Sequence, residues 1–141
     1  IDSAAGLGEE AKSAIHACDE IIIITNPEMA AVTDALKTIK LAEEMNKPVK
    51  GVIVTRYTGK RTEMSIPNLK DMLEKPLLGI IPEAHEVKES QVMKNAVIHT
   101  HPKSQVTKTY VTTSKRLLDS NIKIEPPIKL GFISRLFRGF K

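Results

Sequence analysis

The chain has 141 residues, of which 41% are hydrophobic and 4% aromatic, with one cysteine and no tryptophan. That length suits one domain with a single core. A lone cysteine excludes a disulfide framework and favours a reducing compartment. The longest wholly apolar run, residues 21–24, is far shorter than the roughly 20 residues that cross a bilayer. No secretion signal is evident at the N-terminus, so we expect a cytoplasmic protein.

The positive charge is unevenly distributed. The formal net charge is +4, and residues 122–141 contain five basic residues and one glutamate, so the first 121 residues are neutral overall. All three phenylalanines also lie in that last segment. A nucleic-acid-binding protein usually carries a basic surface over its body. The distribution therefore argues against DNA as a partner.

The first part of the sequence predicts the start of an α/β fold. Residues 1–8 resemble the end of a strand followed by a glycine-containing loop, and residues 9–17 a short helix with acidic residues in its first turn. Residues 21–25 are β-branched throughout. Because a run that is apolar on both faces is typical of a strand covered on both sides, we expect a parallel sheet here.

The remaining elements alternate in type. Apolar residues recur at helical spacing over 28–45, and the pattern continues with a strand at 49–55, a helix at 66–73, a strand at 76–81 and a helix at 86–94. Such alternation predicts βαβ units with right-handed crossovers. We also expect a short strand at 96–98 and a final helix capped by Ser104 and ending near Asp119.

The last 22 residues differ from the body of the chain. Pro126 and Pro127 interrupt the chain, so residues 1–119 are predicted to form the domain, 120–127 a linker and 128–141 a separate amphipathic segment. On a helix from Phe132 onward, the apolar side chains gather within about 140° of arc and the basic ones lie opposite. Within this segment, the residues expected to contact a surface are Phe132, Ile133, Arg135, Leu136, Phe137, Arg138 and Phe140.

This amphipathic segment predicts reversible attachment to an anionic membrane, with rings in the headgroup boundary and cations facing phosphates. A short helix of this kind is marginal in water and forms when its apolar face finds a surface. One tail should bind weakly, while two tails on a dimer should bind far better. The alternative is that the helix docks on the protein's own core or in a partner's groove.

Five motifs in order resemble the MinD ATPases, members of the deviant P-loop group that also includes the ParA partition proteins. Each motif alone is weak, but their order along essentially the whole chain is specific. The motifs are Asp2-Ser3-Ala4-Ala5-Gly6, Thr25-Asn26-Pro27-Glu28, Thr55-Arg56-Tyr57, Gly79-Ile80-Ile81-Pro82-Glu83 and Gly131-Phe132-Ile133-Ser134-Arg135-Leu136-Phe137.

The resemblance implies ATP and Mg²⁺ as cofactors and assigns roles to several residues. Asp2 matches the second switch segment, near the attacking water and, through water, the magnesium ion; Ala4 replaces the usual proline. Asp34 matches a position linked to dimer contacts. Residues that match the adenine pocket are Thr55, Arg56, Pro82 and Glu83, although Ala84 replaces the acidic residue that commonly follows.

The phosphate-binding loop of this family, a glycine-rich turn with Lys and Ser/Thr, does not occur in these 141 residues. The sequence thus resembles only the C-terminal half of the family, which indicates a fragment or one part of a split protein. Without that loop, phosphoryl chemistry lacks its electrostatic cradle. We expect the chain alone to be inactive and to expose apolar surface.

Two other groups of residues are candidate sites by residue type. His99 and His101 alternate before Pro102, but without a third ligand nearby they fit an ordinary loop better than a metal site. Cys18 lies beside the first strand, where a buried small side chain is more common than a nucleophile.

The expected protein is therefore the C-terminal part of a P-loop NTPase-type, mostly parallel sheet flanked by helices, with a C-terminal amphipathic helix. The resemblance implies a dimerising ATPase that positions the cell-division site from the inner face of the membrane, with an activating partner protein. The alternatives are a ParA-type DNA partition ATPase and a non-catalytic α/β domain with an interaction helix.

Overall fold

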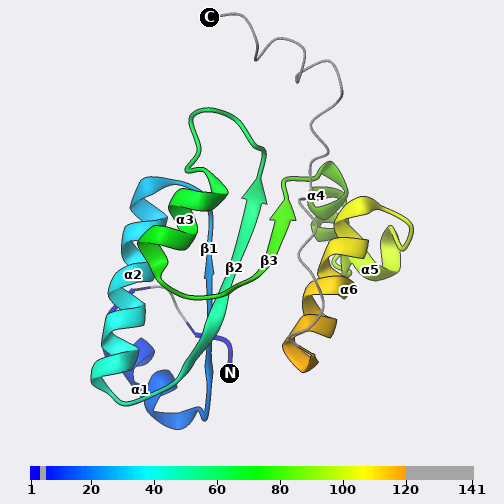
Figure 1. The fold of residues 1–141 in the computed structure, drawn as a ribbon. Coiled ribbons are helices and arrows are strands. Elements are labelled where there is room, and N and C mark those ends of the chain that lie inside the picture. The colour runs from blue at the N-terminus through cyan, green and yellow to red at the C-terminus, as the bar shows by residue number, and fades with distance from the viewer. Residues whose placement is uncertain (4–5, 120–141) are drawn as a thin grey trace, which may run out of the picture.

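The computed structural model describes residues 1–3 and 6–119, which form a parallel sheet between helical layers (Figure 1). The elements, in chain order, are α1 Glu9–Ala17, β1 Ile21–Thr25, α2 Met29–Glu44, β2 Val49–Tyr57, α3 Ile66–Leu73, β3 Leu77–Pro82, α4 His85–Val92, α5 Val97–Thr100 and α6 Gln105–Leu118. This arrangement confirms the predicted fold class; the predicted amphipathic helix at 128–141 lies outside the described residues.

The sheet has the order β1-β2-β3, with both pairs parallel. Ile23 lies opposite Val52, and Ile53 lies opposite Gly79. Each crossover is helical, because parallel neighbours cannot be joined by a tight turn. Within the described sheet, β1 and β3 are therefore the edge strands.

Local sequence signals account for the ends of two helices. The Ser65 hydroxyl accepts a hydrogen bond from the Asn68 N–H at 3.3 Å, and a proline follows in the first turn of α3. The Ser104 hydroxyl accepts from the Thr107 N–H at 3.2 Å, which confirms the predicted cap of α6. These side chains satisfy N–H groups that have no partner within the helix.

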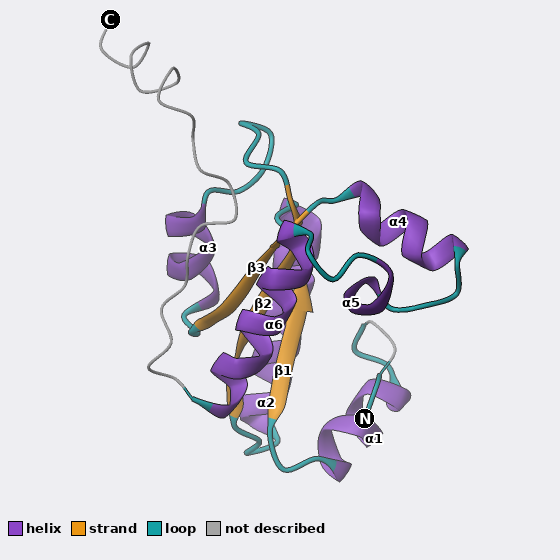
Figure 2. Cartoon of the chain, turned by 90° about the vertical axis from the view of Figure 1, so that its right-hand side faces the viewer, coloured by secondary structure: helices purple, strands orange, loops and turns teal. Residues whose placement is uncertain are grey.

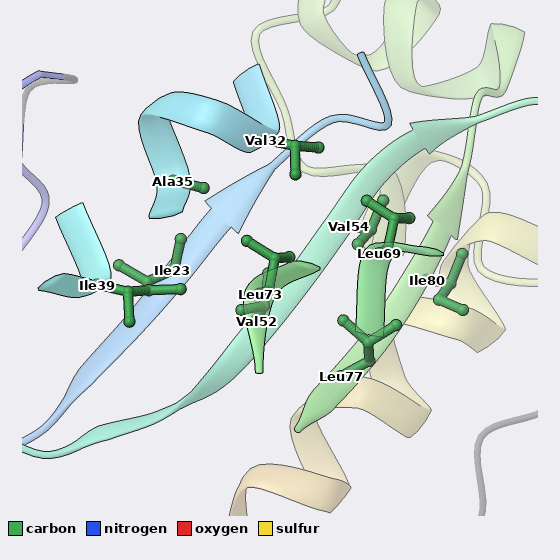
Figure 3. Close-up of a cluster of buried hydrophobic side chains, with 10 residues drawn as sticks. All are labelled: Ile23, Val32, Ala35, Ile39, Val52, Val54, Leu69, Leu73, Leu77 and Ile80. Atoms are coloured by element: carbon green, nitrogen blue, oxygen red, sulfur yellow. The ribbon is translucent and has the colours of Figure 1, made fainter. Parts of the chain in front are cut away.

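The main core lies between the sheet and the layer formed by α2 and α3 (Figure 3). Val32, Ala35 and Ile39 recur at helical spacing on the buried face of α2, and Leu69 and Leu73 do the same on α3. The strands contribute Ile23, Val52, Val54, Leu77 and Ile80. The apolar period of α2 therefore determines which of its faces meets the sheet.

Helix α6 lies on the other side of the sheet, against β3 (Figures 1 and 2). A small cluster of Ile81, Val97 and Val106 forms there, and buried Arg116 donates to the Leu78 carbonyl at 3.0 Å. This layer covers β3 rather than the whole sheet. None of the helices in the described ranges is long and apolar enough to cross a membrane.

The prediction that residues 21–24 are covered on both faces was wrong for the described residues. Ile23 is buried, whereas Ile22 is 39% exposed and Ile24 is 65% exposed. The cause is that α2 covers one face of β1 while α6 packs against β3. The second face of β1 is left open.

The predicted strand at 96–98 was also wrong, because α5 occupies Val97–Thr100 as a single helical turn. Two contacts favour the turn. Val97 is buried in the small cluster with Val106, and the Thr100 hydroxyl meets that of Ser90 at 2.6 Å. Three residues provide too little apolar alternation to distinguish these states.

Gly79 allows α6 to approach β3 closely, which leads to a stability prediction. A Cβ atom there would overlap Thr113 Oγ1 and lie 2.5 Å from its Cγ2. We expect Gly79→Ala to lower the free energy of unfolding by about 1–3 kcal/mol, as overpacking does. Urea denaturation measures this loss.

The matched variant removes the atoms that clash. In a Thr113→Ala background, Gly79→Ala should cost clearly less, because the Oγ1 and Cγ2 atoms are gone. An unchanged midpoint for Gly79→Ala alone would contradict this account of the β3–α6 contact.

Candidate functional site

A cleft of about 750 Å³ follows β1 along its open side. Every residue of β1 lines it, with Ala11, Ala14 and Ile15 from α1 and Ala31, Asp34, Ala35 and Thr38 from α2. Most of its walls are apolar, and polar groups enter from the chain N-terminus and from the ends of β1 and β2. Apolar walls with a few convergent polar groups are typical of ligand sites and of surfaces that receive another polypeptide.

The cleft brings together four of the six residues that the sequence predicted for the nucleotide site and the dimer. Asp2 lines it from the N-terminus, Asp34 from α2, and Thr55 and Arg56 from the end of β2. Thr55 and Arg56 lie at the carboxyl-terminal end of a parallel strand, the side on which open α/β sheets bind ligands.

Hydrogen bonds hold the ends of β1 and β2 together. The Thr55 hydroxyl donates to the Thr25 carbonyl at 3.1 Å, and the Thr25 hydroxyl donates to the Asn26 carbonyl at 3.2 Å. The Asn26 side-chain oxygen then accepts from the Glu28 N–H at 3.1 Å, just before α2 begins. This chain of contacts sets the turn that leads from the sheet into α2.

Arg56 adopts a left-handed backbone conformation, with φ of 57°. A residue other than glycine in this region costs energy and persists only when its surroundings hold it. Arg56 Nε donates to Glu83 Oε2 at 3.3 Å, while the Arg56 side chain stays 67% exposed. Its guanidinium is therefore tethered at one end and open to the cleft.

Pro82 and Glu83 do not line the cleft but adjoin it. Pro82 lies opposite Tyr57 in the β2–β3 register, and the Glu83 N–H donates to the Tyr57 carbonyl at 3.0 Å. The predicted adenine-pocket residues Thr55, Arg56, Pro82 and Glu83 thus gather where β2 and β3 end. Glu83 reaches the cleft through Arg56.

A second cation reaches Glu83 from α4. Lys88 Nζ lies 2.8 Å from Glu83 Oε1, so the two carboxylate oxygens have different partners. The hydrogen bond from Lys88 does most to lower the pKa of Glu83; burial opposes it, while the charge of Lys88 and the contacts of Arg56 add to it. Glu83 therefore stays ionised at neutral pH.

The loop after Arg56 closes on a carboxylate that the sequence did not single out. Glu63 accepts hydrogen bonds from the Thr58 hydroxyl at 2.7 Å, from the Thr58 N–H at 3.0 Å and from the Gly59 N–H at 2.8 Å. Burial alone would raise the pKa of Glu63, but these donors and the Lys60 N–H outweigh it and lower the pKa. The carboxylate ties together the loop that follows Arg56.

Asp34 is an exposed residue of α2 that forms an ion pair with Lys37 at 3.1 Å. It shares the cleft with Asp2, and its assignment to a dimer contact stays a prediction. The predicted membrane-binding residues Phe132, Ile133, Arg135, Leu136, Phe137, Arg138 and Phe140 lie outside the described residues.

Histidines form a separate cluster on α4 and the loop after α5. Glu89 lies 3.1 Å from His85 Nδ1 and 3.1 Å from His101 Nε2. Among residues 1–3 and 6–119, no group of three or more His, Cys, Asp or Glu side chains could hold a metal ion.

Sequence reasoning missed Thr25, Glu63 and Lys88 as contributors to the site. Thr25 lay within a quoted motif, and only the β1–β2 pairing shows that its carbonyl receives the Thr55 hydroxyl. Glu63 and Lys88 lie in segments rich in charged residues, where nothing in the sequence distinguishes them from residues exposed to solvent. Their partners are fixed by the path of the loop and by the start of α4.

The Glu63 contacts lead to a pH prediction. A folded-state pKa below the unfolded value means that the unfolded chain binds more protons, so the stabilisation is complete above about pH 4.3 and is lost as pH falls through the lower folded pKa. We expect Glu63→Gln to unfold more easily than wild type near neutral pH.

The two proteins should converge in stability as the pH falls through the lowered pKa of Glu63 and this carboxylate becomes protonated. Chemical denaturation at a series of pH values measures the difference. A constant difference between pH 7 and pH 3, or none at all, would contradict a role for the ionised carboxylate.

A family model described as "4Fe-4S iron sulfur cluster binding proteins, NifH/frxC family" matches residues 11–139. Such clusters are held by sets of cysteine thiolates. This sequence contains one cysteine, Cys18, which is half-buried and donates to the Ile15 carbonyl at 3.3 Å. One thiol does not supply that ligand set, so the residues of this chain do not fit an iron–sulfur cluster.

Curated relatives include a septum site-determining protein MinD of Buchnera aphidicola, 34% identical over 97% of this chain and 56% of its own length. An uncharacterized ATP-binding protein of Methanocaldococcus jannaschii is 28% identical over 99% of this chain and 53% of its own length. The chain thus spans about half the length of the curated relatives it matches.

Solved structures agree in fold. The MinC:MinD cell division protein complex of Aquifex aeolicus matches with a TM-score of 0.82 at 27% identity, over 89% of this chain and 53% of that one. MinD of Pyrococcus horikoshii in complex with Mg-ADP gives 0.79 at 26%, over 86% and 50%. A ParA family ATPase of Chlorobium tepidum gives 0.59 at 27%, over 66% and 40%.

The solved structures are consistent with the parallel sheet of this chain. The chain therefore belongs to the NifH/frxC family, and it is MinD-like over about half the length of the MinD proteins it matches.

Proposed function

We propose that this chain supplies the adenine-binding and magnesium-facing side of the nucleotide site in a MinD-like, membrane-associated ATPase that positions the cell-division site. One observation carries the proposal. A single cleft is lined by Asp2, Thr55 and Arg56, and Glu83 is paired to Arg56 beside it. These residues come from segments far apart in the sequence, and the sheet brings them together.

The adenine end of the site is assigned to the ends of β2 and β3. The Arg56 guanidinium is planar and exposed, so it can stack on a flat base, and the Glu83 carboxylate fixes its edge. The naming of a relative as ATP-binding and the Mg-ADP bound to a structural neighbour support a nucleotide as the ligand.

The magnesium end is assigned to Asp2. A carboxylate suits Mg²⁺, which keeps several waters and binds proteins through one or two carboxylates. With the ion and ATP bound, the metal would neutralise charge that develops on the transferred phosphoryl group. Asp2 would accept a hydrogen bond from a water molecule near the ion and would thereby orient that water molecule.

The phosphate-binding loop must then come from sequence beyond these 141 residues, which lack one. The structure offers a place for such a segment. The edge of β1 that has no partner strand among residues 1–3 and 6–119 lies along the cleft, and Ile22 and Ile24 expose apolar side chains beside it. A further parallel strand there would pair the open backbone and cover both side chains.

Membrane attachment is assigned to residues 128–141, and dimerisation would regulate it. Full burial of one Phe, Ile or Leu side chain contributes about 1.5–3 kcal/mol, and burial at the interface contributes less. Each cation near anionic lipid adds roughly 1 kcal/mol, so one tail binds reversibly. Two tails on a dimer would raise avidity by about 10²–10⁴ where geometry permits.

The proposal places the protein in the cytoplasm, at the inner face of the membrane, with the dimer contact near Asp34. Asp34 is exposed and borders the same cleft as Asp2, so a second subunit that contacts it would lie close to the nucleotide. A structural neighbour was solved as a complex with MinC, which supports a cell-division protein as partner.

A ParA-type role in DNA partition is the second candidate. The ParA family structure matches the same fold over a smaller part of the chain than the MinD structures do. The neutral first 121 residues lack the excess of basic charge that binding to DNA phosphates requires. A non-catalytic α/β domain with an interaction helix is the third candidate, and the hydrolysis experiment below separates it from the first.

The nucleotide proposal predicts the effect of Asp2→Ala in the complete protein, which joins this chain to the phosphate-binding segment. ATP hydrolysis should fall by at least about a hundredfold, because the group that orients water near the metal is lost. Steady-state phosphate release measures the rate, and circular dichroism checks folding.

Asp71→Ala is the matched control, since Asp71 is an exposed carboxylate on α3 that does not line the cleft. It should leave turnover unchanged. Wild-type turnover in a folded Asp2→Ala protein would remove Asp2 from the site.

The membrane proposal predicts that Phe137→Glu lowers co-sedimentation with anionic vesicles by about tenfold or more, since it places a charge on the apolar face. Ser134→Glu is the matched control, because it changes the charge equally on the polar face of the predicted helix. It should reduce binding far less. If both variants sediment like wild type, the tail is not the anchor.

A further inference from the structure

We propose that Lys88 is a positioning residue for the nucleotide pocket: from α4 it holds the Glu83 carboxylate, which in turn holds the Arg56 guanidinium at the cleft. This inference rests on the proposed function, because it assigns Arg56 to the adenine end of the site. It adds a residue that none of the five sequence motifs contains.

The contacts form a relay across three elements. Lys88 on α4 lies 2.8 Å from Glu83 Oε1, and Arg56 at the end of β2 lies 3.3 Å from Glu83 Oε2. Each oxygen of the carboxylate has its own cation. Rotation of Glu83 away from Arg56 would therefore also break its contact with Lys88.

Arg56 is the member that needs this support. Its backbone is left-handed and its side chain is 67% exposed, so neither helix geometry nor burial restricts the guanidinium. Glu83 is better fixed, because its side chain is 27% exposed and its N–H donates to Tyr57. A carboxylate held at both oxygens is a more rigid anchor than one held at a single oxygen.

Lys88 extends from a helix that is itself anchored. The Glu89 carboxylate on α4 contacts His101, which follows α5, and the hydroxyl of buried Ser90 meets that of Thr100 at 2.6 Å. Helix α4 begins directly after the end of β3, close to the end of β2 (Figure 1). The relay thus links the edge of the cleft to the layer formed by α4 and α5.

The size of the expected effect follows from the exposure of the pair. Isolated surface ion pairs contribute little, and networks with defined geometry contribute more. We therefore expect loss of Lys88 to weaken nucleotide binding by about two- to fivefold rather than to abolish it.

The test measures Mg-ADP affinity by titration calorimetry in the complete protein, in which the phosphate-binding segment is present. Lys88→Met should weaken binding by about that factor, and Lys88→Arg should retain it, because it keeps the charge and a donor. Lys108→Met is the matched control: it removes an exposed lysine from α6 for which the described residues include no ion pair within 4.0 Å. It should bind Mg-ADP like wild type.

A double-mutant cycle separates a relay from a general effect of charge. In a Glu83→Gln background, Lys88→Met should cause no further loss, because the group through which it acts is gone. An equal loss in both backgrounds would overturn the relay. So would wild-type affinity of Lys88→Met when Arg56→Met binds weakly, and that result would leave the proposed function intact.

The proposed function fails separately from the relay. If Arg56→Met and Glu83→Gln both bind Mg-ADP like wild type, the assignment of the adenine end is wrong. In that case the contact between Arg56 and Glu83 can still be tested without nucleotide, by NMR relaxation of the Arg56 Nε–Hε group. Lys88→Met should make that group more mobile while Lys108→Met does not, and equal mobility in both would overturn the relay.

Discussion

Parallel strands must be paired at their edges and covered on their faces, and most features of this chain follow from how far that requirement is met. In the sheet that the structure describes, β2 is paired on both sides. Strands β1 and β3 each have a free edge, but β3 is covered by α6 while β1 also has an open face. The cleft follows that open side. The same unsatisfied strand that leaves the sheet unfinished therefore provides the wall of the candidate site, and one further strand would change both at once.

The order and type of the elements could be predicted because they depend on local patterns. The apolar period of α2 and the caps at Ser65 and Ser104 operate within a few residues. What failed depended on distant parts of the chain. The apolar run at 21–24 predicts a strand covered on both faces. Ile24 stays exposed because α6 packs against β3 rather than against β1. Four letters at 97–100 are too few to separate a turn of helix from a strand.

The site divides in the same way. The family resemblance names Asp2, Thr55 and Arg56 as candidates, and the structure places all three along one cleft, while their roles stay predictions. The residues that hold these candidates in place could not be predicted from the sequence. The carboxylate of Glu63 gathers donors from a loop, and Lys88 reaches Glu83 across the turn into α4. Such contacts depend on the path of the backbone, which cannot be inferred from the presence of a charged residue at one position.

The description of the matching family mentions an iron–sulfur cluster, but the side chains of this chain do not provide the ligands for one. A fold that places strand ends around a nucleotide does not by itself require a metal cluster, since function resides in sites added to a fold. The single thiol is half-buried and donates a hydrogen bond to the helix that precedes it, so this chain lacks the set of thiolates that a cluster requires. Carboxylates and a guanidinium line the cleft instead. The proposed contacts with a hydrated Mg²⁺ ion and with adenine rest on this donor set. What this chain shares with the wider family is thus the scaffold, and the proposed nucleotide site depends on side chains of its own.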